Sequence, residues 1–113
     1  MIAVQTFGGY IKQLRELKGY PLRKVAAALD IDPSTLSKIE KGDRNGNKIM
    51  VAQLARLFDE AEENLNLILL SDKIAFELYD EKNPEKIMEV AGEKIKYLKA
   101  KNMEQGEIKF LHD

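Results

Sequence analysis

The sequence predicts an all-α fold with one N-terminal domain and a helical extension. Apolar residues recur three and four positions apart along six successive segments, as in helices that bury one face. All three prolines, Pro21, Pro33 and Pro84, fall where such a segment begins, a position that tolerates proline. We find no internal repeat, no low-complexity segment and no alternating pattern typical of a strand. We therefore expect five packed helices followed by a sixth.

The first helix is expected to begin after Thr6, a suitable N-cap, and to run through about Leu17. Gly8 and Gly9 each weaken a helix by about 1 kcal/mol, yet they permit close packing or close approach to a phosphate. Lys18-Gly19 ends the helix. The residues expected to face inward are Phe7, Ile11, Leu14 and Leu17.

Residues 22–42 are predicted to form two short helices joined by a tight turn. The first buries Leu22, Val25, Ala26 and Leu29, and Asp30 tolerates the left-handed backbone of the turn. The second begins at Asp32-Pro33, a carboxylate N-cap before a proline, and Gly42 ends it. Its buried residues are Leu36 and Ile39. Helices this short need a larger helical core to be stable.

Three further helices are expected. One spans about residues 49–59, the next opens at Glu62 and is broken by Asn83-Pro84, and the last begins at Pro84. From residue 102 to Asp113 the periodicity fades, so a loose tail or one weak turn is expected there. We place the N-terminal domain at residues 1–70, the helical extension at 71–101 and the tail at 102–113.

Charge divides the chain in two. Residues 1–57 carry ten Lys or Arg against five acidic residues, a net +5, whereas residues 58–113 carry eight against fourteen, a net −6. A basic front half attracts a polyanion, and an acidic rear half orients the encounter.

Four pieces of the front half, in order and at the right spacing, carry a family resemblance. They are residues 11–16 (IKQLRE), Val25-Ala26 before residues 29–31 (LDI), residues 37–42 (SKIEKG) and Leu54-Ala55. From Phe7 to about Phe58 the chain resembles the Xre-type helix-turn-helix domain of phage repressors and Cro. The resemblance implies five packed helices, with the third as the recognition helix of a sequence-specific transcriptional regulator. Two departures from the family pattern are Asp30, where glycine is usual, and Pro21-Leu22, where Ser-Gln is frequent.

The N-terminal turn of a recognition helix reads base edges in the major groove, where hydroxyls and cations match donor and acceptor patterns. Cations and amides around that helix hold the phosphates. We expect base contacts from Ser34, Thr35, Ser37 and Lys38. We expect phosphate contacts from Lys12, Arg23, Lys24, Lys41, Arg44 and Asn45. The alternative for Ser34 is plain helix capping, and for Ser37 a tolerated surface position.

The resemblance also implies an ion pair between Arg15 and Glu40, because a glutamate at this place in the family pairs with the arginine of the first helix. We expect the pair to be partly buried and to fix the first helix against the third.

The rear half has more apolar residues than one small domain needs to bury. A homodimer interface is favoured, because pairing two half-sites about 34 Å apart raises the affinity for DNA. The alternative is that the sixth helix folds back onto the same core. The interface candidates are Leu69, Phe76, Tyr79, Ile87, Val90, Ala91, Ile95 and Leu98.

Other classes of function are disfavoured. The only histidine, His112, lies in the expected tail, and no acid pair, phosphate loop or metal-ligand spacing occurs, so neither an enzyme nor a metal or cofactor site is expected. The absence of cysteine, signal peptide and long apolar run favours a cytoplasmic protein without a membrane segment. The expected partners are double-stranded DNA and a second copy. The alternative is a protein-interaction module, such as an antitoxin that binds a toxin.

Overall fold

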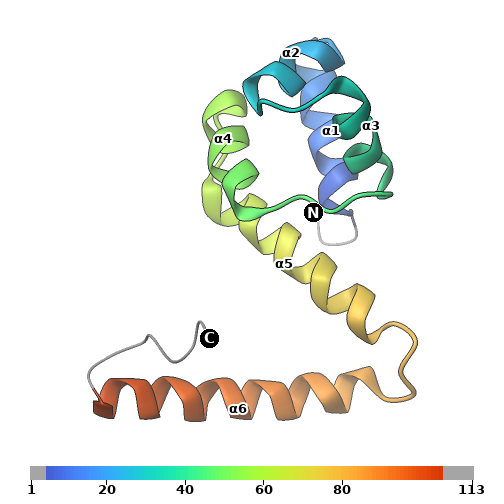
Figure 1. The fold of residues 1–113 in the computed structure, drawn as a ribbon. Coiled ribbons are helices and arrows are strands. Elements are labelled where there is room, and N and C mark those ends of the chain that lie inside the picture. The colour runs from blue at the N-terminus through green and yellow to red at the C-terminus, as the bar shows by residue number, and fades with distance from the viewer. Residues whose placement is uncertain (1–4, 106–113) are drawn as a thin grey trace. The chain divides into compact units, whose positions relative to one another are not determined.

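The structure, a computed structural model, describes residues 5–105; residues 1–4 and 106–113 lie outside the description. Within that range it is all-helical, which confirms the predicted fold class (Figure 1). The chain divides into two compact units between Glu77 and Leu78. The helices are α1 (Phe7–Leu17), α2 (Leu22–Ala28), α3 (Pro33–Lys41), α4 (Lys48–Phe58), α5 (Glu62–Leu78) and α6 (Pro84–Gln105).

The core of the N-terminal unit is apolar. Each of the helices α1 to α4 and the first half of α5 contribute side chains to it. The largest fully buried side chain is Phe58 of α4, and Tyr20 stacks on it with ring centroids 6.2 Å apart. Helices of 7 and 9 residues, such as α2 and α3, are not stable in isolation. The contacts with the rest of the core supply the packing that stabilises them. The core residues outside α4 include Ile11, Val25, Leu36, Leu65 and Ile68.

Caps and left-handed residues set most of the helix ends. The Thr6 hydroxyl accepts a hydrogen bond from the backbone N–H of Gly9 at 3.1 Å, as expected for the N-cap of α1. Asp30 adopts φ = 57° in the turn between α2 and α3, which confirms the left-handed turn. Gly42 ends α3 with φ = 87°. Asp32 occupies the N-cap of α3, but its side chain makes no capping hydrogen bond, so its predicted role as a capping carboxylate is wrong.

One further expectation, at the end of α1, differs from the structure. Leu17 is 74% exposed instead of buried, because it lies at the edge of the apolar stripe in the last turn of α1, just before the chain turns away at Gly19. The N-terminal domain of residues 1–70 stays a prediction, and residue 70 lies inside α5. α6 continues to Gln105, so residues 102–105 belong to its last turn and not to a loose tail, and no glycine or proline interrupts the helix there. The rest of that tail lies outside the described residues.

Tyr10 of α1 donates a hydrogen bond from its hydroxyl to Glu60 Oε1 at 2.9 Å. Burial, and then the hydrogen bond and charge of Glu60, raise the pKa of Tyr10 above its ordinary value of 10.0. The folded state thus favours the protonated phenol. This contribution to stability is fully present below the pKa of the unfolded chain and is lost as the pH rises through the higher pKa of the folded protein.

We therefore expect the stability of the protein to fall more steeply above pH ~10 than that of Tyr10→Phe, which has no phenol to ionise. Thermal denaturation of both proteins between pH 8 and pH 11 measures the two slopes. Parallel slopes would show that Tyr10 does not contribute to the pH dependence.

Among the described residues, no helix has both the length and the apolar content needed to cross a lipid bilayer.

Candidate nucleic-acid interface

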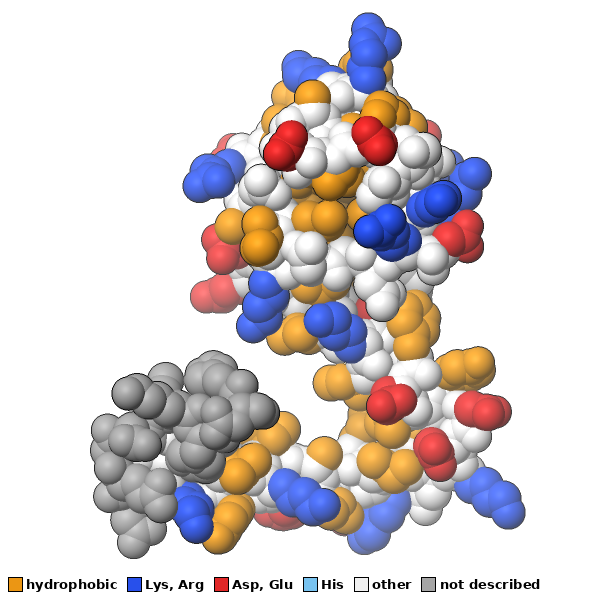
Figure 2. Space-filling model, viewed as in Figure 1, with side chains coloured by type: hydrophobic (Ala, Val, Ile, Leu, Met, Phe, Trp, Pro, Cys, Tyr) orange, Lys and Arg blue, Asp and Glu red, His pale blue; other side chains and the backbone are white. Residues whose placement is uncertain are grey.

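α3 has one buried and one open face. Leu36, Ile39 and Glu40 point into the N-terminal unit and are at most 8% exposed. The other face carries the four residues that the sequence assigns to base contacts: Ser34 and Lys38 are exposed, and Thr35 and Ser37 are half-buried. Figure 2 shows Lys and Arg side chains on the part of the surface where α3 lies. The structure thus brings the four candidates together on one short, polar and cationic face.

The six candidates for phosphate contacts are all exposed. Lys12 belongs to α1, Arg23 and Lys24 to the first turn of α2, and Lys41 to the last turn of α3. Arg44 and Asn45 lie in the loop of residues 42–47, which joins α3 to α4. Lys24 differs from the others because its Nζ lies 4.0 Å from the centroid of the Tyr20 ring. A cation over an aromatic ring is held in place by attraction to the ring face.

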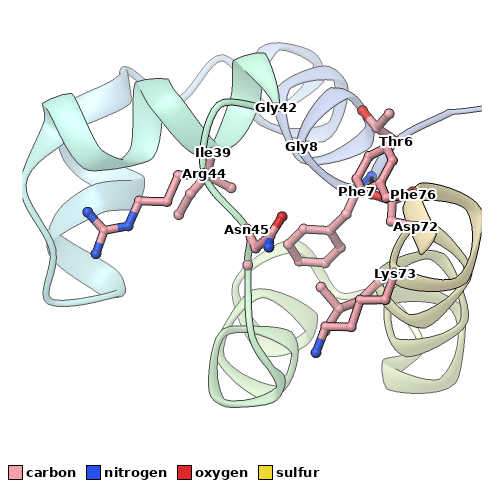
Figure 3. Close-up of a pocket in the computed structure, with 12 residues that line it drawn as sticks. Thr6, Phe7, Gly8, Ile39, Gly42, Arg44, Asn45, Asp72, Lys73 and Phe76 are labelled. Atoms are coloured by element: carbon pink, nitrogen blue, oxygen red, sulfur yellow. Dashed lines mark hydrogen bonds between the residues drawn. The ribbon is translucent and has the colours of Figure 1, made fainter.

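The loop of residues 42–47 packs on Phe7, and this contact was not foreseen from the sequence (Figure 3). A Cβ added at Gly46 would lie 2.6 Å from Phe7 Cε2, so only glycine allows the loop to approach the ring this closely. The backbone N–H of Phe7 in turn donates a hydrogen bond to Asp72 Oδ2 of α5 at 2.8 Å. Asp72 therefore holds the start of α1, on which the loop carrying Arg44 and Asn45 rests.

Arg15 and Glu40 form a bidentate ion pair. Arg15 Nε donates to Glu40 Oε2 at 2.8 Å and Nη2 donates to Oε1 at 3.0 Å, while Nη1 donates to the carbonyl oxygen of Tyr20 at 3.1 Å. The side chains of Arg15 and Glu40 are 14% and 5% exposed. The hydrogen bond with Glu40 raises the pKa of Arg15, so the guanidinium stays charged. One side chain thus joins α1, the turn before α2 and the last turn of α3.

The family model described as helix-turn-helix matches residues 11–64. Residues 11–64 belong to the helix-turn-helix family of Xre and phage repressor-like proteins. The matched segment runs from the second turn of α1 to the first turn of α5, so it contains α3 and the loop after it. No curated protein and no solved structure matches the chain. The helix-turn-helix family is one of DNA-binding regulators and is generally non-enzymatic.

The residues expected at a dimer interface fall into two groups. Leu69 does not fit the expectation, because it is only 2% exposed and packs in the core of the N-terminal unit. The other seven, Phe76, Tyr79, Ile87, Val90, Ala91, Ile95 and Leu98, are exposed. In the part of the chain that the structure describes, no three His, Cys, Asp or Glu side chains gather as metal ligands would. His112 lies outside the described residues.

Proposed function

We propose that this helix-turn-helix chain is a sequence-specific transcriptional regulator that binds a palindromic operator as a homodimer, with α3 in the major groove. One observation carries the proposal: the open face of α3 presents three hydroxyls and one ammonium, while its other face is fixed by Leu36, Ile39 and Glu40. Hydroxyls in the first turn of a helix, followed by a cation one turn later on the same face, are suited to reading base edges.

The surroundings of α3 support the same function. Lys12, Arg23 and Lys41 come from three helices and are exposed, and we expect them to bind phosphates and fix the orientation of the protein. The net charge of +5 over residues 1–57 adds a long-range attraction to DNA. Phosphate neutralisation releases counterions, so the affinity is expected to fall steeply with salt.

Selection of bound sequences from random DNA tests the proposal directly. The expected product is an enriched half-site repeated in inverted orientation, with the half-site centres about one helical turn or a multiple of it apart. A single half-site without the inverted repeat would contradict the homodimer on DNA. No enrichment at all would contradict sequence-specific binding.

Lys38→Ala separates base reading from general attraction. Because Lys38 lies on the face assigned to base contacts, we expect its loss to weaken the preferred site by about 1–3 kcal/mol and random DNA much less. Lys12→Ala is the matched control: it removes an exposed lysine from α1, and we expect it to weaken both DNAs equally. Binding titrations of both variants with the preferred site and with random DNA measure the four losses of affinity. Equal losses from the two substitutions would remove Lys38 from the base-reading set.

A second candidate is a protein-interaction module, for instance an antitoxin. The observation that favours it is the exposed apolar surface of α6 together with the net charge of −6 over residues 58–113. Such a module would copurify with a cationic protein and show no preference for any DNA sequence.

A further inference from the structure

α6 is a helix of 22 residues, about 33 Å long, that buries none of its large apolar side chains. Ile87 is 40% exposed, Met88 48%, Ile95 52% and Leu98 37%. Helices in proteins owe most of their stability to packing of an apolar face. α6 therefore needs an occupant for this face.

The apolar face follows a heptad pattern, with positions written a to g. Met88 and Ile95 fall at a, and Pro84, Ala91 and Leu98 fall at d, so the spacing alternates between four and three over about two heptads. A seam of a and d residues is the pattern by which one helix pairs with another in a coiled coil. Tyr97, which is 62% exposed, lies away from this seam.

Charge is distributed unevenly along the same helix. The N-terminal half, residues 84–93, carries Glu85, Glu89 and Glu93 against Lys86, which pairs with Glu89 at 3.0 Å. The eight residues 94–101 carry four exposed lysines and no acidic residue: Lys94, Lys96, Lys99 and Lys101. One half of α6 is thus acidic and the other basic. In the described part of the chain, Glu104 is the one acidic residue that follows these lysines.

We infer that α6 pairs with α6 of a second copy of this chain in antiparallel orientation, and that this pairing is the dimer contact of the proposed regulator. The inference rests on the homodimer in the proposed function and specifies how it forms. An antiparallel pair sets the acidic half of each helix against the basic half of the other. The apolar seam then closes, with Met88 facing the partner's Leu98 and Ala91 facing the partner's Ile95.

The flanking e and g positions decide between the two orientations. In the antiparallel pair, Glu85 at e faces the partner's Lys99, and the two-fold symmetry makes this opposite-charge contact occur twice. The one like-charge contact is between Lys94 at g and the partner's Lys94. A parallel pair would set Lys94 at g against the partner's Lys99 at e, twice, and would form no opposite-charge contact in compensation. Like charges across such a seam oppose pairing, so antiparallel is the favoured orientation.

Gly92 is consistent with this arrangement. It lies at an e position in the middle of α6, where glycine costs about 1 kcal/mol relative to alanine. A Cβ added there meets nothing within 4 Å, so no contact within the described chain requires a glycine. In the antiparallel pair Gly92 lies beside the two-fold axis, where the absence of a side chain lets the two backbones approach.

The oligomeric state of the full chain, measured by light scattering near 10 µM without DNA, tests the pairing. We expect the mass of two chains for the wild type and of one chain for Ile95→Asp, whose carboxylate would be buried in the seam. Tyr97→Asp is the matched control: it puts the same charge two residues away and off the seam, and it is expected to leave the dimer intact. Thermal denaturation checks that the N-terminal unit stays folded in both variants. A monomeric wild type, as when α6 folds back onto its own chain, or equal effects of the two variants, would overturn the inference.

Orientation is tested by disulfide formation, because the chain has no cysteine of its own. Met88→Cys and Leu98→Cys each place one thiol in the seam. In an antiparallel pair of either variant with itself, the two introduced thiols lie about 15 Å apart along the axis, too far for a disulfide. Neither variant alone is then expected to cross-link, whereas a mixture of the two, one of them carrying a mass tag, is expected to form the mixed disulfide. Cross-linking of each variant with itself would show a parallel pair and overturn the inference.

These experiments also separate the inference from the proposed function. A dimer with the cross-linking pattern described, but without any enriched DNA site, would leave the α6 pairing in place and contradict the regulator. A monomer that still enriches a DNA half-site would overturn the α6 pairing and leave base reading by α3 in place.

Discussion

Replacing Gly8 by alanine is expected to destabilise the N-terminal unit by about 3 kcal/mol or more, at the upper end of the cost of overpacking. The added Cβ would lie 1.9 Å from the carbonyl oxygen of Ile39 and 2.9 Å from its carbonyl carbon. Both are backbone atoms of α3, which cannot rotate aside as a side chain can. α1 and α3 would have to separate and open the core between them. Denaturation of both proteins with urea measures the difference.

Gly9→Ala is the control for this substitution, since it adds the same methyl group to the same helix one residue later. Its Cβ would meet only the Thr6 hydroxyl, at 3.1 Å, and a small movement of that side chain relieves the contact. Because alanine favours a helix over glycine by about 1 kcal/mol, we expect Gly9→Ala to be neutral or stabilising. If Gly8→Ala were equally well tolerated, the close approach of α1 to α3 would not be a requirement of the fold.

Glu40→Ala is expected to cost about 3–5 kcal/mol, because it leaves the guanidinium of Arg15 buried without its carboxylate. Arg15 is 14% exposed and makes two of its three hydrogen bonds to Glu40. The remaining bond, to the Tyr20 carbonyl, cannot neutralise the charge. Thermal and urea denaturation of the variant measure the loss.

The double variant Arg15→Met/Glu40→Met distinguishes an unpaired charge from lost packing. It removes both charges and keeps two long side chains, a change that is often close to neutral for a buried ion pair. We therefore expect it to be clearly more stable than Glu40→Ala. A double variant that is as unstable as Glu40→Ala would show that the pair holds α1 to α3 through its geometry, not through compensation of charge.

Much of the fold could be predicted from the sequence, because local signals set the helix ends. Thr6, Asp30 and Gly42 mark a cap, a turn and a stop by their own chemistry, and each does so in the structure. The helix assigned to base reading, residues 33–41, has the predicted bounds, since proline and glycine enclose it. The placement of the four base-contact candidates on one side of α3 follows from helical periodicity alone.

The features of the structure that could not be predicted depend on contacts between residues that are distant in the sequence, which no local pattern encodes. The hydrogen bond between Phe7 and Asp72 spans 65 positions, and nothing about a single aspartate in α5 distinguishes it from its solvated neighbours. The sequence indicates that Gly46 is a turn residue, but its close approach to Phe7 depends on the tertiary packing of the loop against α1. Leu17 fits the spacing of a buried residue, yet none of the described helices covers the end of α1.

The packing of the loop of residues 42–47 on Phe7, with Asp72 behind it, has a thermodynamic consequence for DNA binding. A loop that is already in place loses little conformational entropy when it meets a phosphate, so little of the binding free energy is spent on ordering it. The heat-capacity change of association should then reflect only the surface that docking removes from water, without the additional contribution of coupled folding. We therefore expect the loop to keep the same conformation in the free protein and in the proposed DNA complex.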